Sequence, residues 1–375
     1  MDSTPPAGPL TGYTVGVTAA RRREELTALL RRRGARVVEA PALRIVPLAD
    51  DTALRRATER CLTAPLDYVV ATTGVGWRGW LSAADGWGHA ARLAEVCRTA
   101  VVLTRGPKAT GAVRAGGLSE SFSPASEATD ELLIWLLARP LDGRRIALQE
   151  HGEPLTAFAA ALRERGAEVI PVPVYRWAPP EDSAPLRRLV EQTARRELHA
   201  VTFTSAPAIS AFLAAADEPG LRAEVLAALR TEVLPVCVGP ICARPLTEAG
   251  ITAHCPERGR LGSMVRELAV ELPARNRREV RTGSGLLTLQ GNAVLVDGGP
   301  PVQLPPLLAA LLRALAEQPG RVLSRPELLR RAWAGTQADE HAVEAAVARL
   351  RSALGAHGRL VRTVPKRGYS LAAAG

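Results

Sequence analysis

The sequence predicts a two-lobed, pseudo-duplicated α/β domain followed by a smaller domain of different construction. Over about the first 270 residues, strand-like and helix-like patterns alternate, which is typical of layered α/β folds. The stretches 67–83 and 199–215 share one order of strand, small polar turn and helix, and 101–118 resembles 234–251 in the same way. This internal repeat indicates two related half-domains. The remaining residues change to strands, three helices and a basic hairpin, so a second domain is expected there.

The first domain is expected to begin with a buried strand, YTVGVT (13–18). An amphipathic helix ends at Gly34, where glycine can adopt the conformation that closes a helix, and a second strand follows. The same order returns later in the chain as a strand at 145–149, a helix at 154–165 capped by Gly166, and a strand at 168–174.

Two proline-containing segments, 40–48 and 169–180, predict extended strands that cross between the lobes. Proline holds its own backbone and that of the preceding residue in extended conformations, which suits a connection with a fixed path. The expected organisation is a flexible leader (1–10), an α/β domain (11–272) with lobe one at 11–44 and 178–272 and lobe two at 48–174, a linker (273–283), and the second domain (284–375).

The second domain starts with LLTLQGNAVLVDG (286–298), which predicts two strands around a Gly-Asn turn. A helix capped by Gly320 follows. The next helix begins at Ser324, three residues before Glu327, which is capping-box spacing. A longer helix is expected to start near Asp339, and a hairpin ends the domain.

Positive charge is concentrated in this second domain. The formal net charge of the chain is +10, and residues 321–375 hold ten Lys or Arg against four Asp or Glu. The segment RNRREVR (275–281) is also basic, and the last hairpin carries Lys366-Arg367-Gly368 at its tip. Such a concentration of positive charge is typical of nucleic-acid binding. The basic tip considered by itself also fits a solvated surface hairpin.

Composition excludes several classes of protein. At 47% hydrophobic and 23% charged residues the chain is ordinary globular protein. It has no run of 18 apolar residues, so no transmembrane span and no membrane partner are expected. The N-terminus, MDSTPPAGPL, lacks the pattern of a signal peptide. The five cysteines are an odd number, which indicates reduced thiols and a cytoplasmic location.

Three motifs of the second domain are PGRVLSRPELLRRAW, AVEAAVARLRSALG and LVRTVPKRGYSL. Together they resemble the winged helix-turn-helix effector domain of OmpR/PhoB-type transcription factors over about residues 284–373. The resemblance implies double-stranded DNA as the partner, with a recognition helix in the major groove and a wing on the phosphate backbone. Few long polar side chains are expected on the recognition helix, because it contains Ala342, Ala345, Ala346 and Ala348. The positions implied to face DNA are His341, Arg349, Arg351, Thr363, Lys366 and Arg367.

The α/β domain carries GARVVEAPALRIVPL, RERGAEVIPVPVYRWAPP, VTFTSAPAISAFL and VGPICARPLTEAGI. In content and order these resemble uroporphyrinogen-III synthase over about the first 265 residues. A phosphoreceiver domain is excluded, since TAARRRE stands where its acidic pair would follow the first strand. The resemblance implies two lobes with a cleft between them. It also implies a lyase reaction, the closure of hydroxymethylbilane with inversion of its last pyrrole ring and loss of water, with no metal or organic cofactor.

Backbone N–H groups in turns of small residues can bind the carboxylates of such a substrate. Tyr175 falls where the family has a tyrosine that assists the departing hydroxyl, since a phenol can donate a hydrogen bond to it. The alternative for Tyr175 is an aromatic side chain packed at a hinge. The resemblance implies substrate contacts at Thr72, Thr73, Gly74, Thr104, Gly106, His151, Gly152, Thr204, Ser205, Ala206, Gly239 and Pro240.

Two functions remain open from the sequence. The first is a DNA-binding transcriptional regulator whose synthase-like lobes sense a tetrapyrrole-like or other small ligand. Proteins with this combination resemble actinobacterial regulators of nitrate and nitrite assimilation genes. The second is a bifunctional protein that still has uroporphyrinogen-III synthase activity and also binds DNA. A homodimer or a partner transcription factor on DNA is left open in both cases.

Two weaker motifs are interpreted as structural. GVGWRG (74–79) fits the G-x-G-x-x-G pattern of dinucleotide sites, but the matching turn in the internal repeat has no glycine. Cys237, Cys242, His254 and Cys255 fit no common zinc-site spacing, so buried thiols are expected there and no metal.

Overall fold

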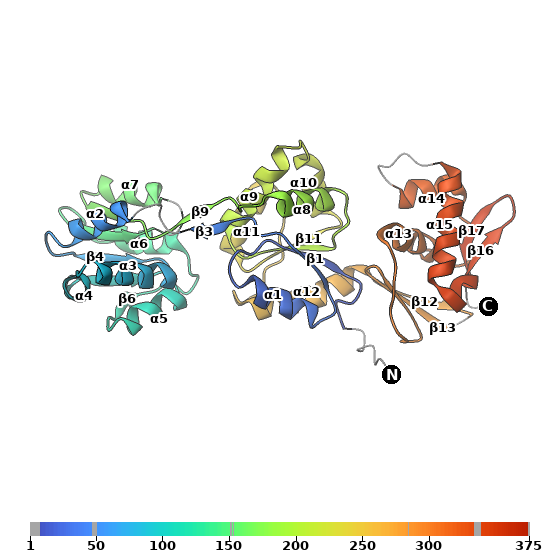
Figure 1. The fold of residues 1–375 in the computed structure, drawn as a ribbon, viewed down its shortest axis with the longest axis horizontal. Coiled ribbons are helices and arrows are strands. Elements are labelled where there is room, and N and C mark those ends of the chain that lie inside the picture. Colours follow the sequence, from blue (N-terminus) through green and yellow to red (C-terminus); the bar gives the residue numbers. More distant parts are fainter. Residues whose placement is uncertain are drawn as a thin grey trace. The chain divides into compact units, whose positions relative to one another are not determined.

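The computed structural model describes residues 8–46, 51–150, 152, 154–283, 285–333 and 339–373 (Figure 1). The chain divides into two compact units, Arg44–Pro179 and a second that combines Met1–Leu43 with Pro180–Gly375. Below, "lobe two" is the first of these units. The second unit contains "lobe one", residues 8–43 and 180–276, and the "winged domain", residues 277–373. No helix within the described residues is long and apolar enough to cross a membrane.

Lobe two is built on a five-stranded parallel sheet in the order β6-β5-β4-β7-β8. Successive residues of its central strand, Val69 and Val70, belong to two different buried clusters, so both faces of the sheet are covered. Its elements are β3 (Arg44–Val46), α2 (Thr52–Cys61), β4 (Tyr68–Ala71), α3 (Gly74–Gly86), α4 (Ala90–Thr99), β5 (Val101–Thr104), α5 (Pro107–Ala115), β6 (Glu120–Phe122), α6 (Thr129–Leu137), β7 (Arg145–Gln149), α7 (Thr156–Glu164), β8 (Glu168–Val172) and β9 (Arg176–Ala178).

Parts of the two proline-containing segments form a pair of crossover strands, whereas residues 169–172 of the second segment belong to β8 of the lobe-two sheet. β3 and β9 are antiparallel neighbours, with the Cα atom of Ile45 opposite that of Trp177. They lie where the chain enters and leaves lobe two, so both connections run through one short ribbon.

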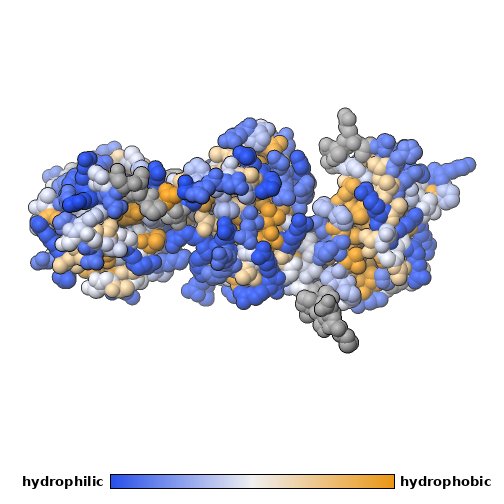
Figure 2. All heavy atoms as spheres, in the orientation of Figure 1, coloured by the Kyte–Doolittle hydropathy of each residue, from blue (hydrophilic) through white to orange (hydrophobic). Residues whose placement is uncertain are grey.

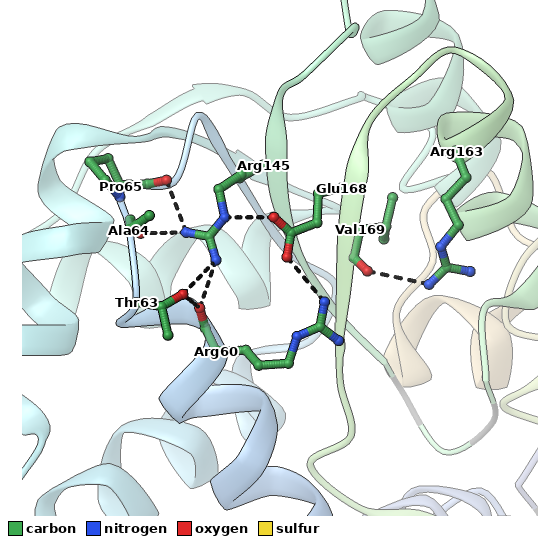
Figure 3. A network of polar contacts seen from close by, with 8 residues as sticks. All are labelled: Arg60, Thr63, Ala64, Pro65, Arg145, Arg163, Glu168 and Val169. Carbon is green, nitrogen blue, oxygen red and sulfur yellow. Dashed lines mark hydrogen bonds and ion pairs between the residues drawn. The ribbon is translucent and has the colours of Figure 1, made fainter.

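Arg145 ties together the amino-terminal edge of the lobe-two sheet (Figure 3). Its guanidinium donates to the carbonyls of Arg60 and Pro65 and to the Thr63 hydroxyl, and its Nε lies 2.8 Å from Glu168 Oε2. Arg145 and Glu168 are the paired first residues of β7 and β8. The network therefore holds the strand beginnings against the end of α2, and it lies at the opposite edge from the turns predicted to bind ligand.

Lobe one has a four-stranded parallel sheet in the order β11-β10-β1-β2. Helices cover both faces, because Phe203 and Val201 pack in one buried cluster and Ala200 packs in another with Val15. Its elements are β1 (Thr14–Val17), α1 (Arg23–Arg31), β2 (Arg36–Glu39), α8 (Ala184–Ala194), β10 (Ala200–Phe203), α9 (Ala206–Asp217), α10 (Arg222–Arg230), β11 (Leu234–Cys237), α11 (Pro240–Glu248) and α12 (Leu261–Asn276).

The winged domain follows the predicted order of strands, three helices and a hairpin around one core. The sequence also predicted its helix starts correctly. Ser324 Oγ accepts from the N–H of Glu327 at 3.3 Å, and Asp339 Oδ1 accepts from the N–H of Ala342 at 3.0 Å. Its elements are β12 (Arg277–Thr282), β13 (Gly285–Gln290), β14 (Ala293–Val296), β15 (Val302–Gln303), α13 (Pro306–Ala316), α14 (Arg325–Ala332), α15 (Glu340–Ala353), a 3₁₀ helix η1 (Gly355–Leu360), β16 (Val361–Val364) and β17 (Gly368–Leu371).

The structure corrects two of the expected connecting segments. The predicted linker, 273–283, instead forms the end of α12 and strand β12, in which Val280 and Thr282 are buried and the residues between and before them are exposed. This alternation lets a basic segment form a strand, because only one face of it is buried. The described end of the predicted leader is also packed, since Leu10 is fully buried and its N–H donates to the carbonyl of Arg33 at 2.8 Å.

A short N-terminal segment joins lobe one to the winged domain. The amide of Gln290, at the end of β13, donates to the carbonyls of Gly8, Pro9 and Thr11 at 3.0–3.3 Å. The N–H of Asn292 donates to the carbonyl of Gly12 at 2.8 Å. Gly12 has a φ of +85°, and a Cβ atom there would lie 2.2 Å from the Gln290 carbonyl oxygen. Only glycine fits at this junction.

Candidate functional site

Helix α15 presents a defined exposed face. Its buried residues, among them Val343 and Leu350, point into the core of the winged domain. Ala346 is fully buried with them, so of the four alanines noted in the sequence it contributes to packing and takes no place on the exposed face. The exposed face is formed by His341, Glu344, Ala345, Ala348, Arg349 and Ser352, which recur at helical spacing.

The two arginines of α15 that were predicted to face DNA have different environments. Arg349 is exposed and has no hydrogen bond or ion pair with any described residue. Arg351 is half-buried. It donates from Nε to the carbonyl of Val361 at 2.9 Å and from Nη2 to Thr363 Oγ1 at 2.8 Å. Arg351 therefore joins α15 to strand β16 of the hairpin and orients Thr363, while Arg349 is available to a partner.

The hairpin β16–β17 is fixed at its base and carries its charge at the tip. β16 and β17 pair from Val361–Leu371 to Val364–Gly368, which leaves a three-residue turn containing Lys366 and Arg367. Figure 2 shows hydrophilic residues over the protruding hairpin. Tyr369 of β17 exchanges backbone hydrogen bonds of 2.8 and 3.0 Å with Leu323, just before α14. The base is thus part of the domain core, and both basic side chains of the tip are exposed.

Ion pairs within the winged domain neutralise several of its acidic side chains. Glu344 pairs with Arg325 at 2.7 Å, Glu327 pairs with Arg331 at 2.9 Å, and Glu317 also pairs with Arg331. The positive charges that these ion pairs leave unmatched lie on α14, α15, η1 and the hairpin β16–β17. Among the described residues that follow α13, the exposed basic side chains with no such partner are Arg330, Arg349, Arg359, Arg362, Lys366 and Arg367.

In lobe two, the predicted substrate turns lie along one edge of the sheet. β4, β5 and β7 are parallel neighbours, so the residues after Ala71, Thr104 and Gln149 share the carboxyl-terminal edge. Thr72, Thr73 and Gly74 lead from β4 into α3, and Gly106 lies between β5 and α5. Thr104 is fully buried and shares a 2.6 Å hydrogen bond with Thr110. This places Thr104 inside the lobe, where it shapes the turn through packing.

Thr73 is the centre of a polar group that also contains Tyr175. Its hydroxyl accepts from the N–H of Gly76 at 3.2 Å and from Gln149 Nε2 at 3.0 Å, and the Tyr175 hydroxyl lies 3.5 Å away. The structure thus brings together two residues that the sequence predicted separately. Gln149 was missed by sequence analysis. Its Oε1 is buried and has no partner among the described residues. The signal for it in the sequence is a polar amide residue that directly follows three apolar residues at the end of β7.

Arg105 lies between Thr104 and Gly106, in a turn that the sequence resemblance implied as a contact, although no role was expected for its side chain. It is half-buried and has no hydrogen bond or ion pair with any described residue. Burial lowers the pKa of its guanidinium, and the nearby Tyr175 and Glu127 partly offset this. A half-buried arginine next to the phenol gives this edge a positive charge suited to a carboxylate.

Glycines near this edge have packing roles. A Cβ atom at Gly76 would lie 2.2 Å from Gln149 Nε2, and one at Gly74 would lie 2.2 Å from the Lys108 carbonyl. The G-x-G-x-x-G pattern therefore lets α3 approach α5 and Gln149, in agreement with its interpretation as structural. Gly152 has a φ of +91° and packs against the Trp177 ring. His151, another predicted contact, lies outside the described residues.

Lobe one has a matching edge of its own. Thr204 and Ser205 follow β10, and α9 begins at Ala206. Gly239 follows β11 and precedes Pro240, the first residue of α11. A Cβ atom at Gly239 would meet no atom within 4 Å, so this turn is open. The residues predicted in lobe one thus form two neighbouring turns at the carboxyl-terminal edge of its sheet.

One group of described side chains could hold a metal ion, namely His254, Glu267 and Glu271. Arg275 already contacts it, with Nη2 2.7 Å from His254 Nε2 and Nε 3.8 Å from Glu271. The guanidinium supplies the positive charge that a metal ion would bring, so the group is satisfied within the protein.

Comparisons with known proteins agree with both halves of this architecture. The family model "Uroporphyrinogen-III synthase HemD" matches residues 24–266, and the model "Transcriptional regulatory protein, C terminal" matches residues 299–371. The uncharacterised protein YjjA of Bacillus subtilis (strain 168) is 30% identical over 264 residues, which are 69% of this chain and 96% of that protein.

Two further relatives carry the name of the enzyme. A putative uroporphyrinogen-III synthase of Methanothermobacter thermautotrophicus is 30% identical over 49% of this chain and 70% of its own length. A crystal structure of a mutant uroporphyrinogen III synthase from Thermus thermophilus is 29% identical, covers 69% of this chain and 99% of that chain, and superposes with a TM-score of 0.59. The chain belongs to the uroporphyrinogen-III synthase family and carries, after the synthase-like lobes, a transcriptional-regulator C-terminal domain with a winged helix fold.

Proposed function

We propose that this protein is a transcriptional regulator whose winged domain binds double-stranded DNA and whose synthase-like lobes sense a carboxylate-bearing ligand, a tetrapyrrole or a related anion. The fusion of the two domains supports the regulator. The observation that carries the proposal is the set of exposed basic side chains left unpaired on the recognition helix and wing, among them Arg349, Lys366 and Arg367. Such side chains reach base edges and phosphates from this fold.

Selection of binding sites from a random duplex library tests the DNA-binding part. The full chain is expected to enrich one sequence family, and Arg349→Ala/Lys366→Ala/Arg367→Ala is expected to lose binding to it. Arg78→Ala is the control, because Arg78 is an exposed arginine of lobe two. A library without enrichment, or a triple variant that binds like the wild type, would contradict the proposal. The recovered sites can then be compared with the upstream regions of nitrate and nitrite assimilation genes, the proposed targets.

The carboxyl-terminal edge of lobe two supports the ligand-sensing part. Arg105 supplies a positive charge, the start of α3 supplies N–H groups, and Tyr175 and Thr73 supply hydroxyls. Titration with uroporphyrin III, followed by quenching of tryptophan fluorescence, measures binding. Arg105→Gln is expected to weaken it by about tenfold or more, as expected for the loss of one charge-assisted hydrogen bond. Arg78→Gln serves as the matched control and is expected to bind like the wild type.

A second function, retained synthase activity, is favoured by the position of Tyr175. Its hydroxyl lies 3.5 Å from Thr73 Oγ1 at the same edge, where it could donate to a departing hydroxyl. The test is formation of uroporphyrinogen III from fresh hydroxymethylbilane, with Tyr175→Phe beside the wild type. Turnover well above the spontaneous reaction, reduced in the variant, would establish a bifunctional enzyme. A folded protein that binds uroporphyrin without turnover would leave the lobes as a sensor.

A further inference from the structure

Lobe one contains three cysteines that come together in the fold. They form the "thiol cluster", Cys237, Cys242 and Cys255, and neither the DNA-binding surface nor the proposed ligand contacts use their sulfur atoms. Cys237 is the last residue of β11, and Cys242 lies in the first turn of α11. The thiol of Cys237 lies close enough to those of both other cysteines for each to affect its acidity. All three thiols are free.

Backbone pairing places Cys255 beside Cys237. The segment after α11 forms a parallel bridge with β11 at Val236 and His254, and the N–H of Cys237 donates to the carbonyl of His254 at 2.8 Å. One residue further along both segments, Cys237 and Cys255 are neighbours in the same register. Adjacent strands lie about 4.8 Å apart, and a disulfide needs Cα atoms roughly 4.4–6.8 Å apart. The two cysteines can therefore be joined without a large movement of the backbone.

The surroundings favour thiol chemistry over metal binding. Successive residues of an extended segment point to opposite sides, so His254 does not face the cluster. Its ring is occupied by Arg275, with Nη2 2.7 Å from Nε2. Within the part of the chain that the structure describes, the three sulfurs do not all lie within 4.8 Å of one another, whereas a structural zinc site gathers four ligands around one ion.

The thiols of the cluster differ in exposure and in acidity. Cys255 is half-buried, whereas Cys237 and Cys242 are buried. The hydrogen bond with Cys237 lowers the pKa of the Cys255 thiol, and the hydrogen bonds with Cys242 and Cys255 raise the pKa of Cys237. Cys255 is therefore the more acidic of the two thiols. It is also the more exposed of the two, so an oxidant reaches it more readily.

The other two cysteines provide a contrast within the same chain. Cys61 and Cys97 are both fully buried in lobe two. Burial raises the pKa of each thiol to about 12, so neither forms a thiolate near neutral pH. These two are expected to be inert towards oxidants.

We propose that the thiol cluster is a redox site in which a hydroperoxide oxidises Cys255 and Cys237 then closes a reversible disulfide with it. In the first step the Cys255 thiolate attacks the peroxide and takes one oxygen to become a sulfenic acid, and the other oxygen takes a proton from solvent and leaves as an alcohol or water. In the second step the sulfur of Cys237 attacks that of Cys255, and the displaced hydroxide leaves as water with the proton of Cys237. The two thiols supply two electrons, the peroxide accepts them, and a dithiol reductant reverses the change.

The location makes the oxidation relevant to the rest of lobe one. Cys237 is two residues from Gly239, in the open turn between β11 and α11. A bond from Cys237 to Cys255 would restrain the end of β11, directly before that turn.

The test is a thiol map of the full chain before and after mild oxidation. Reduced protein is treated with about one equivalent of hydrogen peroxide, unfolded, alkylated and digested. All five thiols are expected to be alkylated before treatment, and two fewer afterwards, with peptides containing Cys237 and Cys255 cross-linked. Dithiothreitol is expected to restore both. Cys255→Ser is expected to abolish the loss, and Cys61→Ser, the matched control, is expected to show the same loss as the wild type.

Several results would overturn the proposal. Five alkylated thiols after oxidation would show that the cluster is inert. A cross-link between Cys237 and Cys242, or between Cys61 and Cys97, would show that Cys255 is not the reactive thiol. Accumulation of Cys255 sulfinic acid without a cross-link would show that Cys237 does not resolve it. Zinc bound to the native protein and released by oxidation would assign the cluster to a metal. The wild-type peptide map decides among these even if a serine variant fails to fold.

Discussion

Two arginines of α15 show how single residues of the same type differ in what they contact. Arg349 and Arg351 are two residues apart on one helix, and the sequence resemblance implied DNA contacts for both. In the structure Arg351 is bound to the carbonyl of Val361 and to Thr363, while Arg349 has no described partner. The difference depends on where β16 passes α15, a tertiary contact that helical periodicity does not encode.

We expect Arg349 to contact bases and Lys366 to contact phosphates, and this difference can be tested by substituting each residue. Arg349→Ala is expected to weaken binding to the selected DNA site by about 1–3 kcal/mol and to leave binding to a scrambled duplex nearly unchanged. Lys366→Ala is expected to weaken both complexes alike and to reduce the slope of log K against log salt by about one. Titrations with both duplexes at several salt concentrations measure this. Equal losses on both duplexes for Arg349→Ala would assign Arg349 to the phosphates.

A buried histidine gives a prediction about pH. His199 precedes β10, and its Nδ1 accepts from the N–H of Thr14 at 3.0 Å. Burial and the nearby charge of Arg313 lower its pKa from 6.5 to about 4. The unfolded chain therefore binds more protons than the folded one between these values. The free energy of unfolding should be insensitive to this group above pH 6.5 and fall by about 2–3 kcal/mol as the pH drops to about 4.

Denaturant unfolding at several pH values checks this expectation. His199→Gln should make the decline between pH 6.5 and 4 shallower, because a neutral side chain removes the proton linkage. The matched control is His341→Gln, since His341 is 90% exposed and should leave the pH profile unchanged. A wild-type profile that His199→Gln does not alter would show that other groups cause the acid sensitivity.

At the scale of elements, the sequence predicted those that follow local rules. The capping signal at Ser324 placed one helix start correctly, the longer helix starts near Asp339 as expected, and the Gly-Asn turn placed the β13–β14 hairpin. The basic composition of 273–283 predicts a linker, because it hides a weak alternation in which Val280 and Thr282 are the buried residues of β12. Strand β12 is stabilised by its pairing with β13. Which segments pair with each other cannot be derived from the residue pattern of one segment.

The hairpin β13–β14 also anchors the N-terminal segment, and Gln290 is the residue that does so. Gln290→Ala would remove the side-chain donor to the carbonyls of Gly8, Pro9 and Thr11, of which that of Thr11 is buried. We expect a loss of about 1–3 kcal/mol in the free energy of unfolding. Gln303→Ala, at an exposed position of β15, is the matched control and should change stability by less than about 0.5 kcal/mol. Similar losses for the two variants in urea unfolding would contradict the anchoring role of Gln290.

At the scale of the whole molecule, the sequence predicted the two kinds of domain more completely than their chemistry. The α/β alternation, the internal repeat and the basic C-terminal region all correspond to structural features. Gln149 was not predicted, and no role was predicted for the side chain of Arg105, because both roles depend on neighbours distant in sequence, such as Thr73 and Tyr175. The substrate contacts and the DNA-facing residues therefore remain predictions that depend on ligand and DNA measurements.

A regulator of this build also needs a physical connection between ligand and DNA. Strand β1 starts beside Tyr13 and ends at Val17, so it connects the junction with the winged domain to the carboxyl-terminal edge of the lobe-one sheet. At the junction Arg313 of α13 donates to the carbonyl of Gly291 at 3.0 Å, and its charge acts on Tyr13. A ligand that changes the turns at one end of β1 can thus bias the contacts at the other end.

The expected outcome is a reciprocal change in affinities that depends on this junction. Saturating uroporphyrin III should change the affinity of the full chain for its selected DNA site by about 5-fold or more, a coupling free energy of about 1 kcal/mol or more. Fluorescence anisotropy with and without the ligand measures it. Gln290→Ala should bind both partners but reduce the coupling, because its anchor to the N-terminal segment is lost, whereas Gln303→Ala should retain it. Equal DNA affinity with and without bound ligand would mean that the lobes do not control DNA binding through this molecule alone.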